Sequence, residues 1–208
     1  MKINEAYDQW SVQYDTNKNK TRDLEGQVMR ELLEGRHFNK TLEIGCGTGK
    51  NTEWLGDNST HITGVDFSEK MLEVARKKIK SDKVSFIQAD ITKSWTFENQ
   101  SFDLITFSLV LEHIESLSDI FQNVSNYLTP NGIVYIGELH PFKQYHGSKA
   151  RFEGESGVFE LECYTHHISE FINEADAIGL KMVHLGEYFD EGETPTIPRI
   201  LGLLFNKK

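Results

Sequence analysis

Three glycines within five residues form the stretch whose residue types say most about chemistry. Gly45, Gly47 and Gly49 follow the apolar run Thr41–Ile44, which is typical of a buried strand. Glycine permits positive φ angles and lacks the Cβ that would keep a ligand away from the backbone. A glycine-rich loop directly after a strand therefore predicts a backbone that lies against a bound nucleotide-type cofactor.

The residues around this loop indicate which kind of cofactor it would take. Lys50 stands where the dinucleotide pattern G-x-G-x-x-G requires its third glycine, and Asn51 excludes the G-K-[ST] ending of a triphosphate loop. Glu43 precedes the glycines, where a carboxylate would repel a pyrophosphate but could accept hydrogen bonds from an ammonium group. We therefore expect a ligand with a cationic or amino end.

Acidic residues follow the next two predicted strands. Asp66 closes Ile62–Val65, and Asp90 comes shortly after Val84–Gln88. At the carboxyl ends of parallel strands, Asp66 could accept both hydroxyls of a ribose and Asp90 could hold an adenine amino group. Further contacts to such a ligand are predicted from Phe67, Met71, Ile91 and Ser108.

The elements that must position these residues alternate between apolar runs and amphipathic segments. The predicted strands are Thr41–Ile44, Ile62–Val65, Val84–Gln88, Phe102–Phe107, Ile133–Leu139, Lys181–Leu185 and Ile200–Phe205. Helices are predicted between most of them, with Ser68 capping one, Leu117–Leu128 forming another and Ser169 capping a third. This alternation predicts a largely parallel sheet with helices on both faces. No clear helix separates the last two strands, so we expect them to pair as an antiparallel hairpin.

Two helices are predicted before the first strand. Tyr7, Trp10 and Tyr14 recur at helical spacing, and a second helix over Leu24–Leu33 would follow. An aromatic stripe of this kind usually packs in a core. The functional alternative is that residues 1–40 form a helical lid in which Tyr14 closes over the ligand.

Composition limits the class of protein. At 208 residues the chain is long enough for one compact domain, 1–208, and short for two. A net charge of −10 argues against bulk binding of nucleic acid or an anionic membrane, because such surfaces need basic fields. Cys46 and Cys163 have no metal-ligand spacing, so no metal site is expected. The N-terminus carries no apolar signal segment, and we expect a cytoplasmic protein.

Five ordered blocks resemble the class I S-adenosylmethionine-dependent methyltransferases, particularly the small-molecule branch called type 11 or 12. They are LEIGCGTGKNTEWL, GVDFSEKML, FIQADI, FDLITFSLVLEHI and LTPNGIVYIGELHP, within Leu42–Pro141. The resemblance implies a Rossmann-like α/β fold whose seven-stranded, mostly parallel sheet has its last strand antiparallel. It also implies S-adenosylmethionine as cofactor, with Glu43 and the glycines at the methionine part, Asp66 at the ribose, and Asp90 with Ile91 at the adenine.

The segment Glu138–His167 is too long for a simple loop and carries four of the eight histidines. We expect residues 141–167 to form an insertion on the side of the methyl acceptor. His140 is the best candidate for a catalytic base, and the alternative is a histidine that only bonds the next turn. Other candidates for the acceptor side are His113, Glu138, Lys143, Lys149, Arg151, His166 and His167.

Two classes of function follow from these patterns. The first is a methyltransferase that transfers a methyl group to an oxygen, nitrogen or carbon atom of a small-molecule acceptor, which could be polar or anionic. The second is a regulatory or partner subunit that binds S-adenosylmethionine or S-adenosylhomocysteine without transferase activity. A macromolecular acceptor is a variant of the first class, and a dehydrogenase is a more distant possibility. The expected assembly is a monomer or a homodimer.

Overall fold

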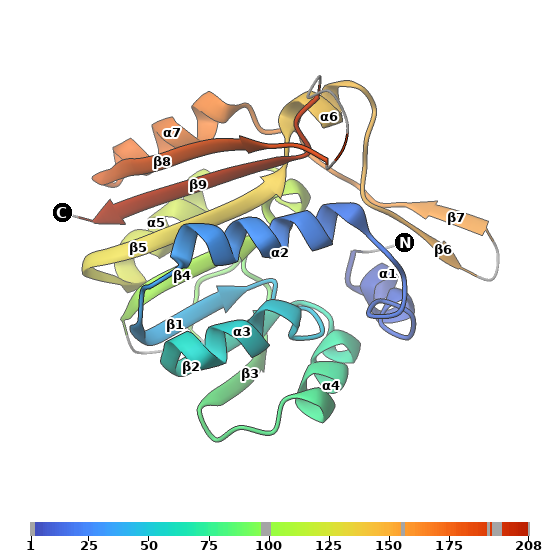
Figure 1. The fold of residues 1–208 in the computed structure, drawn as a ribbon, viewed down its shortest axis with the longest axis horizontal. Coiled ribbons are helices and arrows are strands. Elements are labelled where there is room, and N and C mark those ends of the chain that lie inside the picture. Colours follow the sequence, from blue (N-terminus) through green and yellow to red (C-terminus); the bar gives the residue numbers. More distant parts are fainter. Residues whose placement is uncertain (1–2, 97–100, 155–156, 191, 193–196, 208) are drawn as a thin grey trace.

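The computed structural model describes residues 3–96, 101–154, 157–190, 192 and 197–207, and its centre is one seven-stranded sheet (Figure 1). The helices are α1 (Ile3–Trp10), α2 (Lys20–Leu33), α3 (Lys50–Asn58), α4 (Glu69–Lys78), α5 (Ser118–Tyr127), α6 (Pro141–Tyr145) and α7 (Ile168–Ala177), with a short 3₁₀ helix, η1 (Leu111–His113). The strands are β1 (Phe38–Ile44), β2 (Ser59–Asp66), β3 (Val84–Gln88), β4 (Phe102–Ser108), β5 (Leu128–Leu139), β6 (Arg151–Gly154), β7 (Gly157–Glu160), β8 (Leu180–Tyr188) and β9 (Ile200–Lys207).

The strand order of the large sheet is β3-β2-β1-β4-β5-β9-β8. Pairs from β3 to β5 are parallel, whereas β9 runs antiparallel to both β5 and β8. The predicted seven strands, and the prediction that the last strand is antiparallel, are therefore confirmed. The chain leaves β1 toward β2 on one side and returns to β4 on the other, so the strand order reverses between β1 and β4.

Alternating side chains divide the core into two layers. Leu104, Tyr135 and Leu204 pack with α2 and α3 on one face, while their neighbours along the same strands pack with α5 and α7 on the other (Figure 1). A strand points successive side chains to opposite faces, so strands covered on both faces need apolar residues at consecutive positions. This explains why the predicted strands were continuous apolar runs rather than alternating ones.

Two local predictions were wrong, and two elements were missed. The first helix ends at Trp10, and Tyr14 lies in the turns that follow, although its ring still packs beside Trp10. The N-cap of α7 is His167 instead of Ser169, because Glu170 reaches back to the His167 backbone N–H and completes a capping box. The helix α6 and the β6–β7 hairpin were not predicted.

The described residues include no helix with the length and apolar character that crossing a bilayer would require. Among the same residues, no three His, Cys, Asp or Glu side chains are grouped closely enough to hold a metal ion.

Candidate active site

The glycine loop lies where the strand order reverses, at the carboxyl end of β1. The backbone N–H groups of Gly45 and Cys46 donate to the Val65 carbonyl, 2.8 and 3.1 Å away, which fastens the loop to β2. Gly45 has φ 72°, and a Cβ on it would come within 2.9 Å of Val110 Cβ. Only glycine fits here, because a side chain would be strained by φ and would meet the segment after β4.

Asp66, the last residue of β2, stabilises the glycine loop through its side-chain carboxylate. Its Oδ2 accepts from Gly47 N–H at 2.8 Å, and its Oδ1 accepts from Ser68 N–H at 2.8 Å. Burial raises the pKa of Asp66 to about 6, although these two backbone donors oppose the shift. Each carboxylate oxygen keeps a further acceptor position, so Asp66 can bind ligand hydroxyls without releasing the loop.

A cavity of about 140 Å³ opens beside Asp66. Nine of the eleven predicted cofactor-binding residues line it: Tyr14, Gly45, Gly47, Asp66, Phe67, Met71, Asp90, Ile91 and Ser108. Val65 and Ala89 add apolar surface near Ile91. We call this space the donor cavity.

The structure does not place Glu43 or Gly49 in the donor cavity. Glu43 lines a smaller adjoining cavity that shares Gly45, Gly47 and Ser108 with it. Gly49, with φ 80°, is the N-cap of α3, and a Cβ there would come within 2.7 Å of Ile79 Cδ1. The position of Gly49 therefore serves close packing between α3 and α4.

Two residues that sequence reasoning missed surround Glu43. Glu25 of α2 is buried, and its carboxylate accepts from Tyr135 Oη at 2.9 Å and from Asn51 Nδ2 at 3.0 Å. The side-chain oxygen of the same asparagine, Asn51 Oδ1, is buried without a hydrogen-bond partner among the described residues. The signal in the sequence was an acid on the buried stripe of α2, one turn before Val28 and Met29.

These acceptors fit the amino end of the predicted cofactor. Burial raises the pKa of Glu43 to about 8 and also raises the pKa of Glu25. A cationic ligand would stabilise the ionised carboxylates and supply the donor that Asn51 Oδ1 lacks. Asp66 in the donor cavity fits a ribose, and Val65, Met71 and Ile91 fit an adenine ring.

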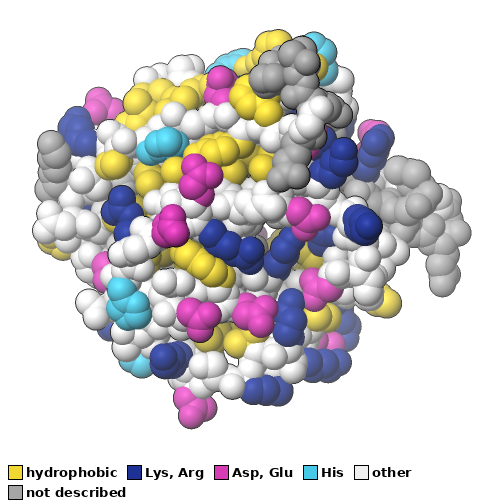
Figure 2. All heavy atoms as spheres, in the orientation of Figure 1, with side chains coloured by type: hydrophobic (Ala, Val, Ile, Leu, Met, Phe, Trp, Pro, Cys, Tyr) yellow, Lys and Arg dark blue, Asp and Glu magenta, His cyan; other side chains and the backbone are white. Residues whose placement is uncertain are grey.

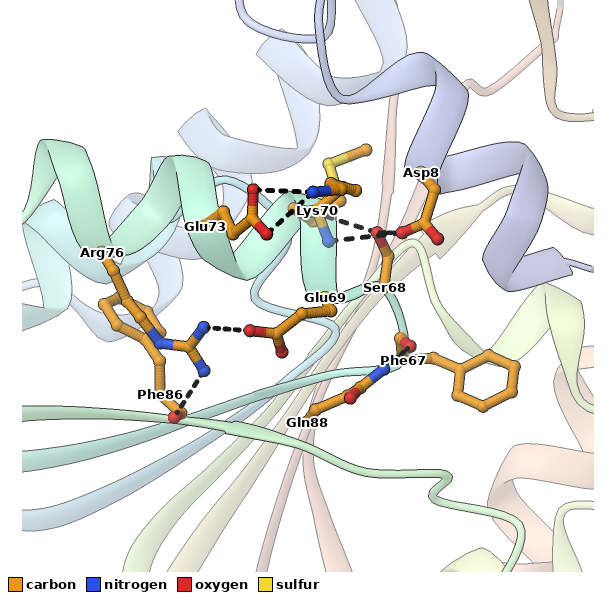
Figure 3. A network of polar contacts seen from close by, with 10 residues as sticks. Asp8, Phe67, Ser68, Glu69, Lys70, Glu73, Arg76, Phe86 and Gln88 are labelled. Carbon is orange, nitrogen blue, oxygen red and sulfur yellow. Dashed lines mark hydrogen bonds and ion pairs between the residues drawn. The ribbon is translucent and has the colours of Figure 1, made fainter.

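The N-terminal helix α1 covers the donor cavity with Ile3 and Tyr7. It is fastened to the start of α4 because Ser68 Oγ donates to Asp8 Oδ1 at 2.6 Å, as Figure 3 shows. Tyr7 Oη and His113 Nε2 share a hydrogen bond of 2.8 Å, which joins α1 to η1. Tyr14 lies under the guanidinium of Arg22, 3.9 Å from the ring centroid.

A second cavity, of about 450 Å³, adjoins the donor cavity. The two share Tyr7, Tyr14 and Leu109 as wall residues. The second cavity is lined further by η1 at Glu112 and by residues 146–151, which belong to the predicted acceptor-side insertion. We call it the acceptor cavity.

Glu138, at the end of β5, supports the segment between the two cavities. Its Oε1 accepts from the backbone N–H groups of Val110 and Leu111, at 3.0 and 2.8 Å. Burial raises the pKa of Glu138 to about 8, and nearby Glu112 adds to the shift. Glu138 therefore positions the loop that carries Leu109 and Glu112, rather than facing either cavity itself.

His140 caps α6 in this structure. Its Nδ1 accepts from Phe142 N–H at 3.1 Å, and its Nε2 bonds Glu187 Oε1 at 2.9 Å. Both ring nitrogens are thus engaged, and His140 lines neither cavity. This arrangement corresponds to the alternative from the sequence, and it gives the predicted base role no support.

The two roles of His140 are separated by replacing it with Asn, which also caps helices well but is no base. We expect His140→Asn to retain turnover, and His140→Ala to lose roughly 1 kcal/mol of stability as other lost N-caps do. Chemical denaturation and steady-state turnover of both variants would check this. A large loss of turnover in a stably folded His140→Asn protein would restore the base assignment.

Three other histidines that were candidates for the acceptor side make structural contacts. His113 Nδ1 bonds the Glu162 carbonyl at 3.1 Å, and His166 Nε2 bonds the Ile114 carbonyl at 2.7 Å. His167 Nδ1 shares a 2.5 Å hydrogen bond with Tyr145 Oη. Of these three, only His113 lines the donor cavity.

An open α/β sheet with its cavity at the point of strand reversal defines a Rossmann-like nucleotide-binding protein. Residues 42–136 match the family described as "Methyltransferase domain". The match covers the glycine loop, Asp66, Asp90 and β4, and the fold agrees with it. Residues 42–136 therefore carry this methyltransferase domain, and the sheet has the fold of the class I S-adenosylmethionine-dependent methyltransferases.

Individual proteins similar to this chain share 30% or less of its sequence in the examples that follow. An uncharacterised protein of Haemophilus influenzae is 30% identical over 153 residues, covering 71% of this chain and 60% of that protein. A ubiquinone biosynthesis O-methyltransferase of Coxiella burnetii is 29% identical over 147 residues, covering 69% and 60%. The chain thus spans about 60% of the length of these relatives. The N-methyltransferase NodS of Bradyrhizobium japonicum, solved with S-adenosyl-L-homocysteine, has a similar fold, with a TM-score of 0.73, 19% identity and coverage of 98% and 97%.

Proposed function

We propose that this chain transfers a methyl group from S-adenosylmethionine to a small-molecule acceptor. The observation that carries the proposal is the pair of adjoining cavities, which share Tyr7, Tyr14 and Leu109 as walls. One cavity carries the residues suited to an adenosine, and the other has the size typical of small-molecule sites. A partner subunit that only binds the cofactor would not need an acceptor cavity beside the donor cavity.

Each part of the cofactor has a proposed binding group. Asp66 would accept the ribose hydroxyls, Asp90 and Ile91 would hold the adenine, and Glu43 would bind the amino group. Glu25 and Asn51 would support Glu43 at the methionine end, because both lie beside it and Asn51 Oδ1 is free to accept. The bound cofactor supplies a methyl group on a sulfonium, which is already activated toward nucleophiles.

The protein then has mainly to align the acceptor and exclude water, which is enough for large rate accelerations. The acceptor cavity is polar along α2, η1 and residues 146–151, so we propose an oxygen or nitrogen nucleophile on a polar acceptor. The relative from Coxiella burnetii is named as an O-methyltransferase, which supports an acceptor of this kind. Walls from α1 and the segment 146–151 would cover the reacting atoms.

Binding and turnover test the proposal separately. Calorimetry should detect 1:1 binding of S-adenosylhomocysteine and no comparable binding of NAD. A screen of small hydroxyl- and amine-bearing compounds with radiolabelled S-adenosylmethionine should then yield labelled product. Tight S-adenosylhomocysteine binding, with methylation seen only on macromolecules in an extract, would replace the small-molecule acceptor by a macromolecular one.

A further inference from the structure

Charge is unevenly distributed around the acceptor cavity. Four cationic residues line it, against two acidic residues, although the chain as a whole carries a net charge of −10. The cations are Arg22, Lys149, Arg151 and Arg199, and the acids are Glu112 and Glu160. Figure 2 shows Lys and Arg side chains gathered around the N-terminal end of α2, which borders this cavity. A cavity whose wall carries an excess of one sign of charge concentrates ligands of the other sign.

Two of the four cations are already engaged by the protein. Arg199 forms a two-pronged ion pair with Asp190, with both N···O distances 2.6 Å. Arg22 donates to the carbonyls of Tyr14 and Asn17 at 2.6 and 2.9 Å. These contacts fix Arg22 and Arg199 as parts of the wall.

Lys149 and Arg151 differ from them. Neither side chain forms a hydrogen bond or an ion pair with another residue that the structure describes, and both side chains are exposed in the cavity wall. Glu160 lies opposite Arg151 in the β6–β7 register, yet no ion pair joins them. Their charges are therefore available to a ligand.

The backbone between them is held in place. Ala150 packs against the cluster of Ala6, Trp10, Met71 and Leu161, and its carbonyl accepts from Leu161 N–H at 2.9 Å. Side chains two residues apart in an extended chain point to the same side. Because Ala150 is anchored, the side chains of Lys149 and Arg151 are held on one side of the chain. Both line the acceptor cavity.

We propose that Lys149 and Arg151 form an oxyanion subsite, which binds a carboxylate or phosphoryl group of the methyl acceptor. The acceptor then carries two functions, an oxyanion at residues 149–151 and a nucleophilic atom near Tyr7 and Leu109. The guanidinium of Arg151 can form bidentate hydrogen bonds with two oxygens of the anion, and the Lys149 ammonium adds a second positive charge. That the ligand is the methyl acceptor rests on the proposed methyltransferase function. Anion binding at the oxyanion subsite can be measured without turnover.

The test uses the full-length protein saturated with S-adenosylhomocysteine and three probes of similar size: benzoate, phenyl phosphate and the uncharged benzamide. NMR titration should show that at least one anionic probe binds 10-fold or more tightly than benzamide, with affinity falling as salt rises. Lys149→Gln and Arg151→Gln should each weaken that binding about 5-fold. Glu160→Gln should strengthen it, because it removes the acid opposite Arg151. Lys83→Gln, which alters a lysine outside the cavity, should leave it unchanged.

Comparison of the two anionic probes shows whether a carboxylate or a phosphoryl group is preferred. Equal affinity for benzamide and both anions, or unchanged affinity in Lys149→Gln and Arg151→Gln, would overturn the subsite. Binding of S-adenosylhomocysteine, measured by calorimetry on the same variants, should stay unchanged. If the unaltered protein failed to bind S-adenosylhomocysteine, the proposed function would fail while the anion titration in its absence still decided the subsite.

Discussion

Asp66→Ala is expected to weaken binding of S-adenosylhomocysteine by roughly 10- to 100-fold, corresponding to about 1.5–3 kcal/mol. Two losses combine in this variant. The ribose hydroxyls lose a charged acceptor, and Gly47 and Ser68 lose the carboxylate that accepts from their backbone N–H groups at 2.8 Å. The glycine loop should therefore be less well ordered even before the ligand binds.

Asp66→Asn separates these two losses. Its amide oxygen can still accept one backbone hydrogen bond, so the loop should be retained better than in Asp66→Ala, while the negative charge is absent. We expect its affinity to fall between that of the unaltered protein and that of Asp66→Ala when measured by calorimetry. Unchanged affinity in Asp66→Ala would remove Asp66 from the cofactor site.

Stability should fall as pH rises from 5 to 8 in the protein without ligand. Burial raises the pKa of Glu43 and Glu138 to about 8 and that of Asp66 to about 6, all above the values expected in an unfolded chain. The folded protein then holds more protons than the unfolded chain, and its stability is lost as pH rises through the folded pKa values. Each such group can contribute up to about 1.4 kcal/mol per pH unit.

His140 acts in the opposite direction, because burial lowers its pKa and its neutral form gains stability as pH rises. One histidine is outweighed by three carboxyl groups. Urea denaturation at pH 5, 6, 7 and 8 would measure the slope, and Glu138→Gln should reduce it while still accepting from Val110 and Leu111. S-adenosylhomocysteine should stabilise the protein more at pH 8 than at pH 5, since its ammonium favours ionised Glu43. A stability that is flat or rising across this range would show that these carboxyls ionise as exposed ones do.

The sheet could be predicted from sequence because its strands are covered on both faces. Ile62–Val65 has no charged residue and Phe102–Phe107 has four apolar residues in six, so these segments could be recognised as strands, and the helices between them indicated their order. The hairpin β6–β7 has no such signal, since it lies outside the main sheet and is fixed by packing against α1. Tyr14 was assigned to a helix because its spacing fits one, but spacing does not show where a helix stops.

The candidate site was predictable where one strand end or one loop supplies the residue. Gly45 and Asp66 stand at the ends of predicted strands and Asp90 follows one closely, and they meet because parallel strands end at the same edge. Glu25 and Asn51 come from helices on either side of the glycine loop, so only the three-dimensional packing brings them to Glu43. For His140 the sequence predicts the position, at the end of a strand, but does not predict the direction in which its ring points.

The contacts of α1 have a consequence for the timing of the reaction. Tyr7 of α1 lines both cavities. The helix is held by the hydrogen bond between Asp8 and Ser68, the N-cap of α4, and by packing of Ala6 and Trp10 against Leu161. Any displacement of α1 that frees one ligand also exposes the other to solvent. We therefore expect displacement of α1 to release the two products in one coupled event.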